Sequence, residues 1–515
     1  MPRLPVLVDG DCDSRFDAVK QVFRDNFVYG WECEGAAFAV YLNGEKVIDL
    51  WGGYADASSR RRWKSNTMTL IFSSTKSVCA ICFALLVDRG LVAYEDLVTK
   101  YWPEFGQNGK ETITIDQLFS HQAGLAFVDG TIEEADVKDW TRMSRLFEKQ
   151  APNWTPGECV GYHAITIGWL YDQLVRRIDP KRRSLSTFFK EEIAIPYDID
   201  LVIGAPLEME HRIARLSASP KLTIAREIVE FPIILRLVWN MIAARASQQN
   251  LLSKVSQNVA WMGNVILIFK FKFRGYGNFG VTDLLIFNNP DYRGLDVPAA
   301  TGMSTARALA KLHSLIADGK FLKASTVEKI TKPIVVDQMD LVLTIPETKG
   351  KGFIFTKNIK GQWMIGHPGM GGQNVKVDVT NKVAFAYISN NLKSGMSDYV
   401  VTFMRLQRAL YSCLDENNLL VDNLTDIPPT INPTTETTAD KLPTNEPQKA
   451  DRPQPKKLIV ENANDKEPPR NLPPRRPKTG SPPANVVKTN TDMSVSKTNA
   501  QAGAMTDAEK MTAEN

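Results

Sequence analysis

The 515-residue chain is short of cysteine, of long uncharged apolar runs and of basic blocks, and each shortage excludes a class of protein. Six irregularly spaced cysteines do not provide the disulfide framework of a small secreted protein. A formal net charge of +4, spread along the sequence, offers no electrostatic surface for nucleic acid, so we expect no such partner. The N-terminal segment lacks the apolar stretch of a secretory signal, which favours a cytoplasmic protein.

The longest apolar stretches, residues 228–244 and 259–269, are poor candidates for membrane spans. A spanning helix needs about 20 mostly apolar residues. The first stretch contains Glu230 and Arg236, and the second is too short. We expect buried helices. The alternative is a lid or a membrane-surface patch assisted by the basic side chains of residues 270–274.

Cys79 and Cys82 form a CxxC pair on a predicted helix, with no histidine nearby. Core packing is the expected role of both thiols, and metal binding or redox chemistry is the alternative. Nothing else in the sequence implies a metal or another cofactor.

Aromatic residues are absent after Tyr411, and 14 of the 29 prolines fall between Pro428 and Pro483. A segment of this composition cannot bury a core. We predict one folded domain over residues 10–424 and a disordered tail over residues 425–515. The proline-rich segment 468–478 is expected to be a solvated linker, and a ligand for a polyproline-recognising domain is the alternative.

Strand patterns at the two ends of the folded part predict a shared sheet. Residues 36–42 and 46–51 are joined by Asn43-Gly44, a strong hairpin signal. Further strand patterns lie far downstream, at residues 362–365, 374–379 and 383–389. Helices are expected at residues 16–27 and 399–414, and the middle is mainly helical. We therefore predict an α/β (α+β) fold, an antiparallel sheet flanked by helices, with a helical subdomain inserted within about residues 80–300.

A serine and a lysine stand three residues apart at the start of a predicted amphipathic helix, in the segment FSSTKSVCAICFALL. This spacing places Ser73 and Lys76 on one face of the helix. The helix N-terminus favours negative charge beside Ser73. A lysine whose pKa is lowered by burial can accept the serine proton, which is the logic of an S-x-x-K nucleophile. Ser73 also follows a strand pattern at residues 69–72. The same serine-lysine spacing at Ser494 and Lys497 lies in the predicted tail and has neither the strand pattern nor the helix.

Tyr162 follows a glycine-rich turn in PGECVGYHAITIGWL and precedes another predicted helix. A phenol near a lysine ammonium can share its proton and act as a general base toward a serine. Tyr162 is therefore the candidate third member of the site. A core tyrosine bonded to the backbone is the alternative.

A third cluster, GHPGMGG at residues 366–372, lies between strand patterns. Its glycines allow a substrate to approach the strand edge closely, and a backbone N–H there can pair with that of Ser73 to bind an oxyanion. His367 stands where a substrate-facing side chain is expected. A phosphate loop is excluded, because no Lys-Ser/Thr follows and the next segment is a strand pattern, not a helix.

In order and separation, FSSTK, GYHA and GHPGMGG resemble the motifs of the serine β-lactamase and penicillin-binding-protein superfamily, particularly its class C-like esterases and animal β-lactamase-domain proteins. The resemblance covers residues 10–415 and extends to flanks such as ITIDQLFSHQAGL. It implies a sheet with helices on both sides, a helical subdomain, and an active site between them.

The resemblance also implies roles for individual residues. Ser73 would be the acylated nucleophile, with Lys76 and Tyr162 as its activating pair. His367 with Gly369 would stand in place of the family's K-T-G strand. The N–H groups of Ser73 and Met370 would form the oxyanion hole.

Two departures from the family pattern bear on the substrate. Tyr162-His163-Ala164 replaces the usual Y-x-N, which removes the amide that binds lactam or peptide substrates. His367 replaces the usual lysine, so a substrate carboxylate would meet a weaker, pH-dependent cation. We therefore expect an esterase-like serine hydrolase that acts through an acyl-enzyme on a small ester or amide. The alternative is a catalytically weak or inactive, self-assembling scaffold of the same fold.

Overall fold

The computed structural model describes residues 5–232, 235, 251–259, 281–395 and 397–421, all within one compact unit of the chain that ends at Thr430. A ten-stranded antiparallel sheet runs through this unit. In sheet order, its strands are β1 (Val8–Cys12), β3 (Glu45–Asp56), β2 (Gly35–Leu42), β14 (Val383–Ser389), β13 (Asn374–Asp378), β12 (Trp363–Gly366), β11 (Phe353–Lys357), β10 (Pro346–Gly350) and β9 (Val335–Met339), with β4 (Arg61–Arg62) paired to β3.

The two ends of the domain meet in this sheet, because β2 pairs with β14 along its length, from Ala36↔Ser389 to Leu42↔Val383. The predicted sheet of N- and C-terminal strands is therefore confirmed. The β2–β3 hairpin turns at Asn43 and Gly44, whose φ angles are 54° and 81°. Asn-Gly tolerates this left-handed conformation, which matches the twist of the flanking strands.

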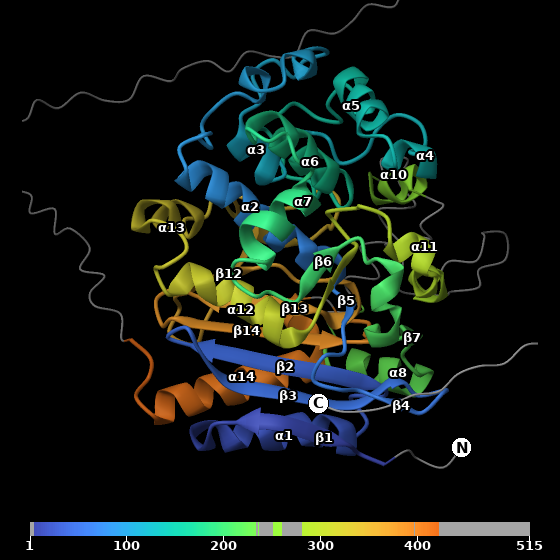
Figure 1. Ribbon diagram of the computed structural model, residues 1–515, viewed down its shortest axis with the longest axis vertical. Coiled ribbons are helices and arrows are strands. Elements are labelled where there is room, and N and C mark those ends of the chain that lie inside the picture. The colour runs from blue at the N-terminus through green and yellow to red at the C-terminus, as the bar shows by residue number, and fades with distance from the viewer. Residues whose placement is uncertain (1–4, 233–234, 236–250, 260–280, 396, 422–515) are drawn as a thin grey trace, which may run out of the picture. The chain divides into compact units, whose positions relative to one another are not determined.

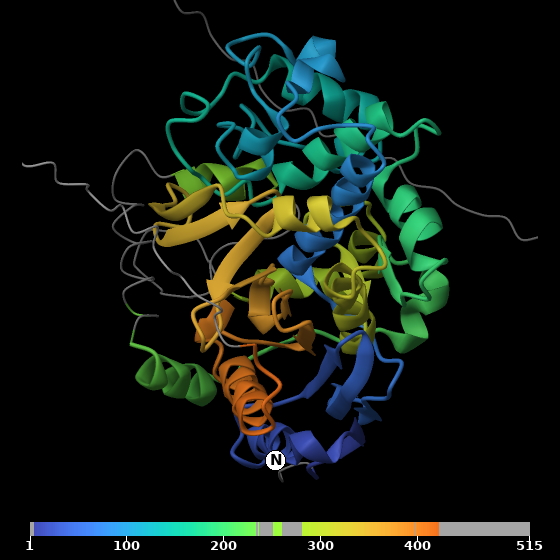
Figure 2. The ribbon, with the colours of Figure 1, turned by 90° about the vertical axis from the view of Figure 1, so that its left-hand side faces the viewer.

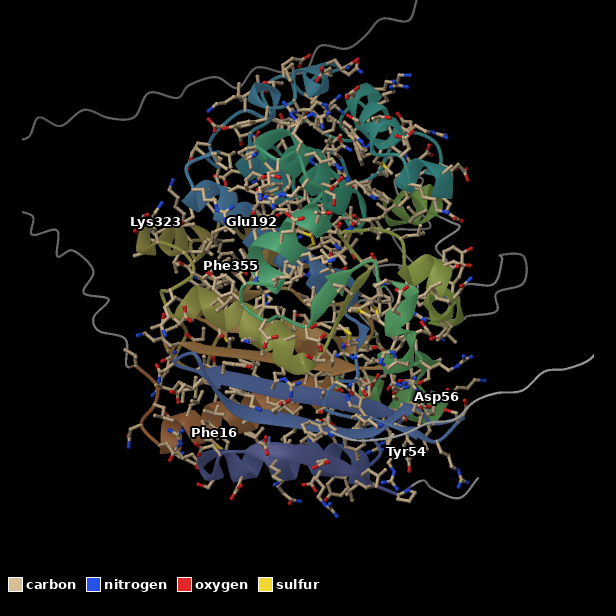
Figure 3. All side chains as sticks on the ribbon, viewed as in Figure 1. Phe16, Tyr54, Asp56, Glu192, Lys323 and Phe355 are labelled. Carbon is tan, nitrogen blue, oxygen red and sulfur yellow. The ribbon has the colours of Figure 1, made fainter. Side chains whose placement is uncertain are left out.

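Helices α1 (Asp17–Val28) and α14 (Val401–Glu416) cover one face of the sheet and appear below it in Figure 1. Both helices were predicted, α1 from its apolar spacing. Phe16, which precedes α1, lies beside α14 (Figure 3). Phe385 of β14 stacks against Phe403 of α14 with ring centroids 6.0 Å apart. Burial of these aromatic side chains holds the two helices on the sheet.

Helix α12 (Ala306–Ala317) covers the opposite face, and the remaining helices lie beyond it or beside it, except α8, which lies beside the sheet near β4 (Figure 1). They are α2 (Thr75–Asp88), α3 (Ile115–Phe119), α4 (Glu134–Val137), α5 (Trp140–Lys149), α6 (Thr166–Ile178), α7 (Leu185–Phe189), α8 (Lys221–Glu230), α10 (Leu251–Asn258), α11 (Pro290–Arg293) and α13 (Ala324–Ile330).

Helix α2 is the centre of the helical part, and the prediction that it is amphipathic was wrong. Its residues from Thr75 to Leu86 are all buried, and it contacts α6, α7, α13 and β11. A helix that is enclosed on every side needs apolar residues all round. Cys79 and Cys82 are buried free thiols within it, which confirms their core role.

Several strands were not predicted. The short strands β8 (Gly302–Ser304) and β6 (Leu201–Ile203) form a small sheet with β5 (Thr69–Leu70), which does lie in the strand pattern predicted before Ser73. Another two, β7 (Ser217–Ala218) and β15 (Asn391–Leu392), pair with each other. Strands of two or three residues are too short to show a periodic pattern. Strands β9 to β11, yellow to orange in Figure 2, extend the main sheet to the helical part, where Asp340 forms a bridge with Val160.

Some sequence predictions fall on residues that the structure does not describe. The predicted tail, residues 425–515, lies outside the described residues, as does most of the apolar stretches 228–244 and 259–269. Among the described helices, none has both the length and the apolar character needed to cross a bilayer.

Candidate active site

A strained turn between β5 and α2 presents Ser73. Phe72 has a φ of 45°, which is unusual for a residue with a bulky side chain. Two hydrogen bonds with Gly302 of strand β8 stabilise the turn. The Ile71 N–H donates to Gly302 O at 2.9 Å, and the Gly302 N–H donates to Thr75 Oγ1 at 3.0 Å. These hydrogen bonds hold the turn in place. Ser73 itself is partly exposed, so a substrate can reach its hydroxyl.

Lys76 lies one helical turn after Ser73, as the spacing predicted. Its Nζ is 2.9 Å from Ser73 Oγ and 2.9 Å from the carbonyl oxygen of Ala299. The side chain is buried, and loss of hydration lowers the pKa of Lys76 to about 7. A lysine with this pKa is neutral in a large fraction of molecules near neutral pH, and a neutral amine accepts a proton.

Tyr162 reaches the same point from the turn before α6. Burial raises the pKa of its phenol, and a hydrogen bond with Ser73 partly offsets that effect. The Lys76 Nζ lies 5.1 Å from the centroid of the Tyr162 ring. The structure thus brings together the hydroxyl, the amine and the phenol that the sequence singled out.

A buried ion pair beside Tyr162 was missed by the sequence reasoning. Lys349 Nζ of β10 is 2.5 Å from Asp340 Oδ2, and both side chains are almost fully buried. Lys349 Nζ also lies 5.3 Å from the centroid of the Tyr162 ring. Asp340 Oδ1 accepts the backbone N–H of Tyr162 at 3.1 Å. No local motif marks these two residues, because strands β9 and β10 reach the site only through tertiary pairing.

Two further buried histidines surround Tyr162. His121 packs edge-on against the Tyr162 ring at 5.1 Å, and its Nδ1 accepts the backbone N–H of His163 at 3.2 Å. His163 Nε2 accepts the Leu125 N–H at 2.9 Å. Burial lowers the pKa of both imidazoles, that of His163 to about 4, so both are neutral near pH 7. Both imidazoles fill space around Tyr162. The sequence analysis included His121 in the flanking segment ITIDQLFSHQAGL but gave it no role.

The third motif differs from the expectation at His367. Its imidazole is buried and lies 6.0 Å from the Tyr162 ring, centroid to centroid. Burial, together with the nearby Lys76, lowers its pKa well below the usual value. His367 is therefore neutral, and the expectation of a pH-dependent cation for a substrate carboxylate was wrong. The His367 backbone O accepts the hydroxyl of Ser74 at 2.9 Å, which ties the motif to the nucleophile turn.

Gly369 and Met370 follow His367 beside the same turn. The Gly369 N–H donates to Gln373 O at 2.7 Å, so it serves the loop and is not directed at a substrate. A Cβ on Gly369 would lie 2.3 Å from Ile71 O, and only glycine allows this approach to the strand before Ser73. Met370 begins a short helical turn, Met370–Gly372, immediately after it.

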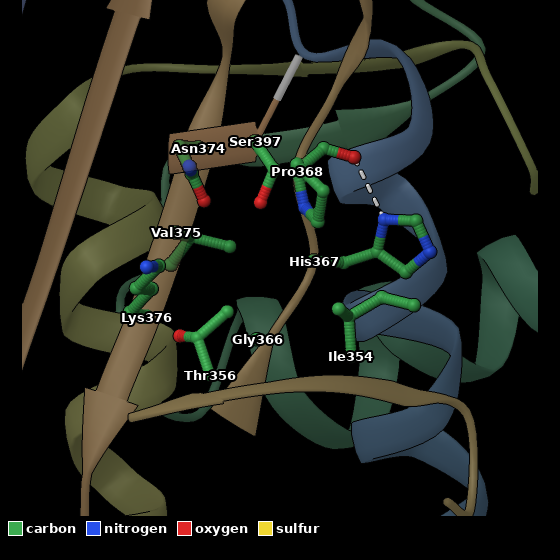
Figure 4. A pocket seen from close by; sticks show the side chains of 9 residues that line it. All are labelled: Ile354, Thr356, Gly366, His367, Pro368, Asn374, Val375, Lys376 and Ser397. Carbon is green, nitrogen blue, oxygen red and sulfur yellow. Dashed lines mark hydrogen bonds between the residues drawn. The ribbon is translucent and has the colours of Figure 1, made fainter. Parts of the chain in front are cut away.

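A small pocket lies beside the third motif (Figure 4). Thr356, Gly366, Asn374 and Lys376 line it, and by strand register and alternation they share the sheet face that carries α14. Within the described residues, neither polar atom of the Asn374 amide has a hydrogen-bond partner. His367 turns its ring away, and its Nδ1 donates to Pro368 O at 2.7 Å. We therefore do not assign this pocket to the Ser73 site.

Comparisons with known proteins identify the family of the chain. The family model described as Beta-lactamase matches residues 23–408. The chain is 31% identical over 394 residues to the esterase/beta-lactamase LipL of Mycobacterium tuberculosis, a match that covers 75% of this chain and 84% of that protein.

Solved structures give the same result. A family VIII carboxylesterase is 28% identical with a TM-score of 0.66, and the match covers 79% of this chain and 100% of that one. A penicillin-binding protein homologue from Caulobacter crescentus is 31% identical with a TM-score of 0.62 and the same coverage. The chain therefore belongs to the beta-lactamase family.

Proposed function

We propose that this protein is an esterase-like serine hydrolase, with Ser73 as its nucleophile and with Lys76 and Tyr162 as the groups that move the proton. One observation carries the proposal. A buried lysine with a pKa of about 7 lies 2.9 Å from a partly exposed serine hydroxyl, and a buried phenol bonds to the same hydroxyl. Structural lysines gain nothing from such burial, whereas a general base needs it.

Acylation starts when the Ser73 hydroxyl approaches an ester carbonyl. Neutral Lys76 takes the hydroxyl proton as the Oγ–C bond forms, and the carbonyl oxygen becomes an oxyanion. The intermediate then collapses with cleavage of the C–O bond to the leaving group. The proton passes from Lys76 through the Tyr162 phenol to the departing alkoxide. Water enters, and the same groups run the steps in reverse to release the acid.

The oxyanion is proposed to lie between two backbone N–H groups, those of Ser73 and Met370. Ser73 lies immediately before α2, so the positive end of the helix dipole adds to the field at the oxyanion. Gly369 brings the third motif against Ile71, and this close approach sets the distance between the two donors.

Small esters or amides are the proposed substrates, with esters preferred to lactams. Ala164, a buried residue two positions after Tyr162, offers no side-chain amide to orient the acylamino group of a lactam. Neutral His367 offers no cation to a substrate carboxylate. The names of LipL and of the carboxylesterase support an ester substrate for this chain.

Labelling with a fluorophosphonate probe tests the nucleophile. The wild-type protein should be labelled at Ser73, and Ser73→Ala should lose both labelling and ester hydrolysis while keeping its thermal unfolding midpoint. Loss of a nucleophile costs several orders of magnitude in rate. Labelling at another serine would reject the assignment, and a wild-type protein that is neither labelled nor active would favour the inactive scaffold.

A further inference from the structure

Two ammonium groups flank the ring of Tyr162. The Nζ atoms of Lys76 and Lys349 lie 5.1 Å and 5.3 Å from its centroid, both within the range of a cation–π contact. The proposed mechanism uses Lys76 alone. Lys349 belongs to β10, which lies near the opposite edge of the sheet from the N-terminal strands β1 to β3. It has no role in the steps of the proposed mechanism.

Asp340 holds Lys349 in this position and also fixes Tyr162. Its Oδ2 contacts Lys349 Nζ at 2.5 Å, while its Oδ1 accepts N–H groups from Tyr162, Val342 and Leu343 at 3.1, 2.9 and 2.8 Å. One carboxylate therefore links the lysine to the backbone of the proposed general base. A buried ion pair is costly to desolvate, so its presence beside a reactive phenol calls for a function.

Other charged groups around Tyr162 do not replace this cation. The titratable groups that face Tyr162 are Lys76, Lys349, Asp340, Glu347, His121 and His367. His121 and His367 are neutral, and the charge of Lys349 helps to keep them so. Asp340 and Glu347 are acids, which oppose ionisation of the phenol. Among these groups, Lys349 is the cation that does not give up its charge during the proposed proton transfer.

We propose that Lys349, held by Asp340, is a positioning residue that favours loss of one proton from the fully protonated Lys76–Tyr162 pair and so prepares the pair to accept the proton of Ser73. The inference rests on the proposed function. A positive charge near a titrating pair stabilises its deprotonated form. Lys349 thus extends the pH range of acylation toward acid, by acting on Tyr162 and without touching the substrate.

The test measures kcat/KM for p-nitrophenyl acetate from pH 5 to pH 9 in four variants. Lys349→Met removes the charge and keeps most of the apolar stem. The double variant Asp340→Asn/Lys349→Met avoids an unpaired buried carboxylate, and its Asn side chain still accepts the Tyr162 N–H. Lys349→Arg retains the charge. Glu347→Gln removes the acid, whose pKa is raised to about 7 by burial.

Lys349→Met should move the acidic limb of the profile to higher pH by about one unit, which is about tenfold in kcat/KM on that limb. The double variant also loses the opposing charge of Asp340, so its limb should move in the same direction by a smaller amount. Lys349→Arg should keep the wild-type limb. Glu347→Gln should move the limb the other way, to lower pH, by a smaller amount, because Glu347 carries only part of a negative charge on that limb. A purely structural role would lower activity in these variants without opposite shifts of the limb.

Lys351→Met is the matched control. Lys351 is also buried, pairs with Asp116 at 3.4 Å, and lies 5.3 Å from the centroid of the Tyr94 ring, away from Ser73. This variant should leave the limb in place. If the wild-type protein is labelled at Ser73 and active, but neither the Lys349→Met variant nor the double variant shifts the limb, the inference is overturned and the proposed function stands. If the wild-type protein is not labelled at Ser73, the proposed function itself fails.

Discussion

Lys76→Arg is the most informative perturbation of the proposed mechanism. Arginine keeps a positive charge in the same place but does not lose its proton in a protein. It can still donate hydrogen bonds to Ser73 and Ala299 but cannot take the Ser73 proton. Loss of a general base costs about 10²- to 10⁴-fold in rate, and we expect a loss of this size in kcat/KM with a folded protein.

The pH dependence of the wild-type acylation rate also tests whether Lys76 is the general base. With a pKa of about 7 for Lys76, about a tenth of the molecules have a neutral amine at pH 6 and about nine tenths at pH 8. The acylation rate should therefore rise about tenfold over this interval. An ordinary lysine, with a pKa of about 10.4, would still be almost fully protonated at pH 8.

The assay is initial-rate hydrolysis of p-nitrophenyl acetate, read at the isosbestic wavelength of nitrophenol, with Ser73→Ala as the blank for spontaneous hydrolysis. Glu347 also has a pKa of about 7, so the profile is repeated with Glu347→Gln, in which an acidic limb should persist. A profile that is flat between pH 6 and pH 8, or a Lys76→Arg variant with wild-type activity, would refute the reasoning about Lys76.

Three further outcomes follow from single contacts. Gly369→Ala should lower stability by about 1–3 kcal/mol and slow probe labelling, since its Cβ would lie 2.3 Å from Ile71 O; an unchanged melting temperature and labelling rate would contradict the close approach. Burial raises the pKa of Asp296 to about 7, so the folded state holds this proton more tightly than the unfolded state, and stability falls as pH rises from about 4 to above 7. Urea unfolding should therefore show Asp296→Asn more stable than the wild type at pH 8, by up to about 4 kcal/mol, with little gain at pH 4. Steady-state kinetics should show p-nitrophenyl acetate cleaved far faster than penicillins or cephalosporins, and Ala164→Asn should raise lactam acylation without loss of ester cleavage; faster lactam than ester turnover in the wild type would count against the proposed substrate class.

Local sequence patterns were sufficient for the elements that depend on near neighbours. Asn43-Gly44 predicted its hairpin because few residues accept the left-handed conformation that this turn needs. Apolar spacing predicted α1, which buries one stripe against the sheet. The same reasoning failed for α2, because a helix buried on all sides has no polar stripe to reveal its period.

In the candidate site, too, some features follow from the local sequence and others depend on the tertiary structure. Ser73 and Lys76 share one helical turn, so their proximity follows from spacing alone, and Tyr162 could be singled out from its motif and from family resemblance. Its contact with them depends on α6 packing against α2. The carbonyl of Ala299 and the Asp340–Lys349 pair carry no motif, and the neutral state of His367 is a consequence of burial.

The sequence by itself determined the identity and order of the reactive groups, the sheet that joins the two ends of the domain, and the family. Only the tertiary structure decided the protonation states on which the chemistry depends. A pKa reflects the hydration and the charges that surround a group in three dimensions, and residues that are distant along the chain supply both of them. Lys76 can act as a base because the folded protein excludes water from it, with the Ala299 carbonyl as its hydrogen-bond acceptor 223 positions away.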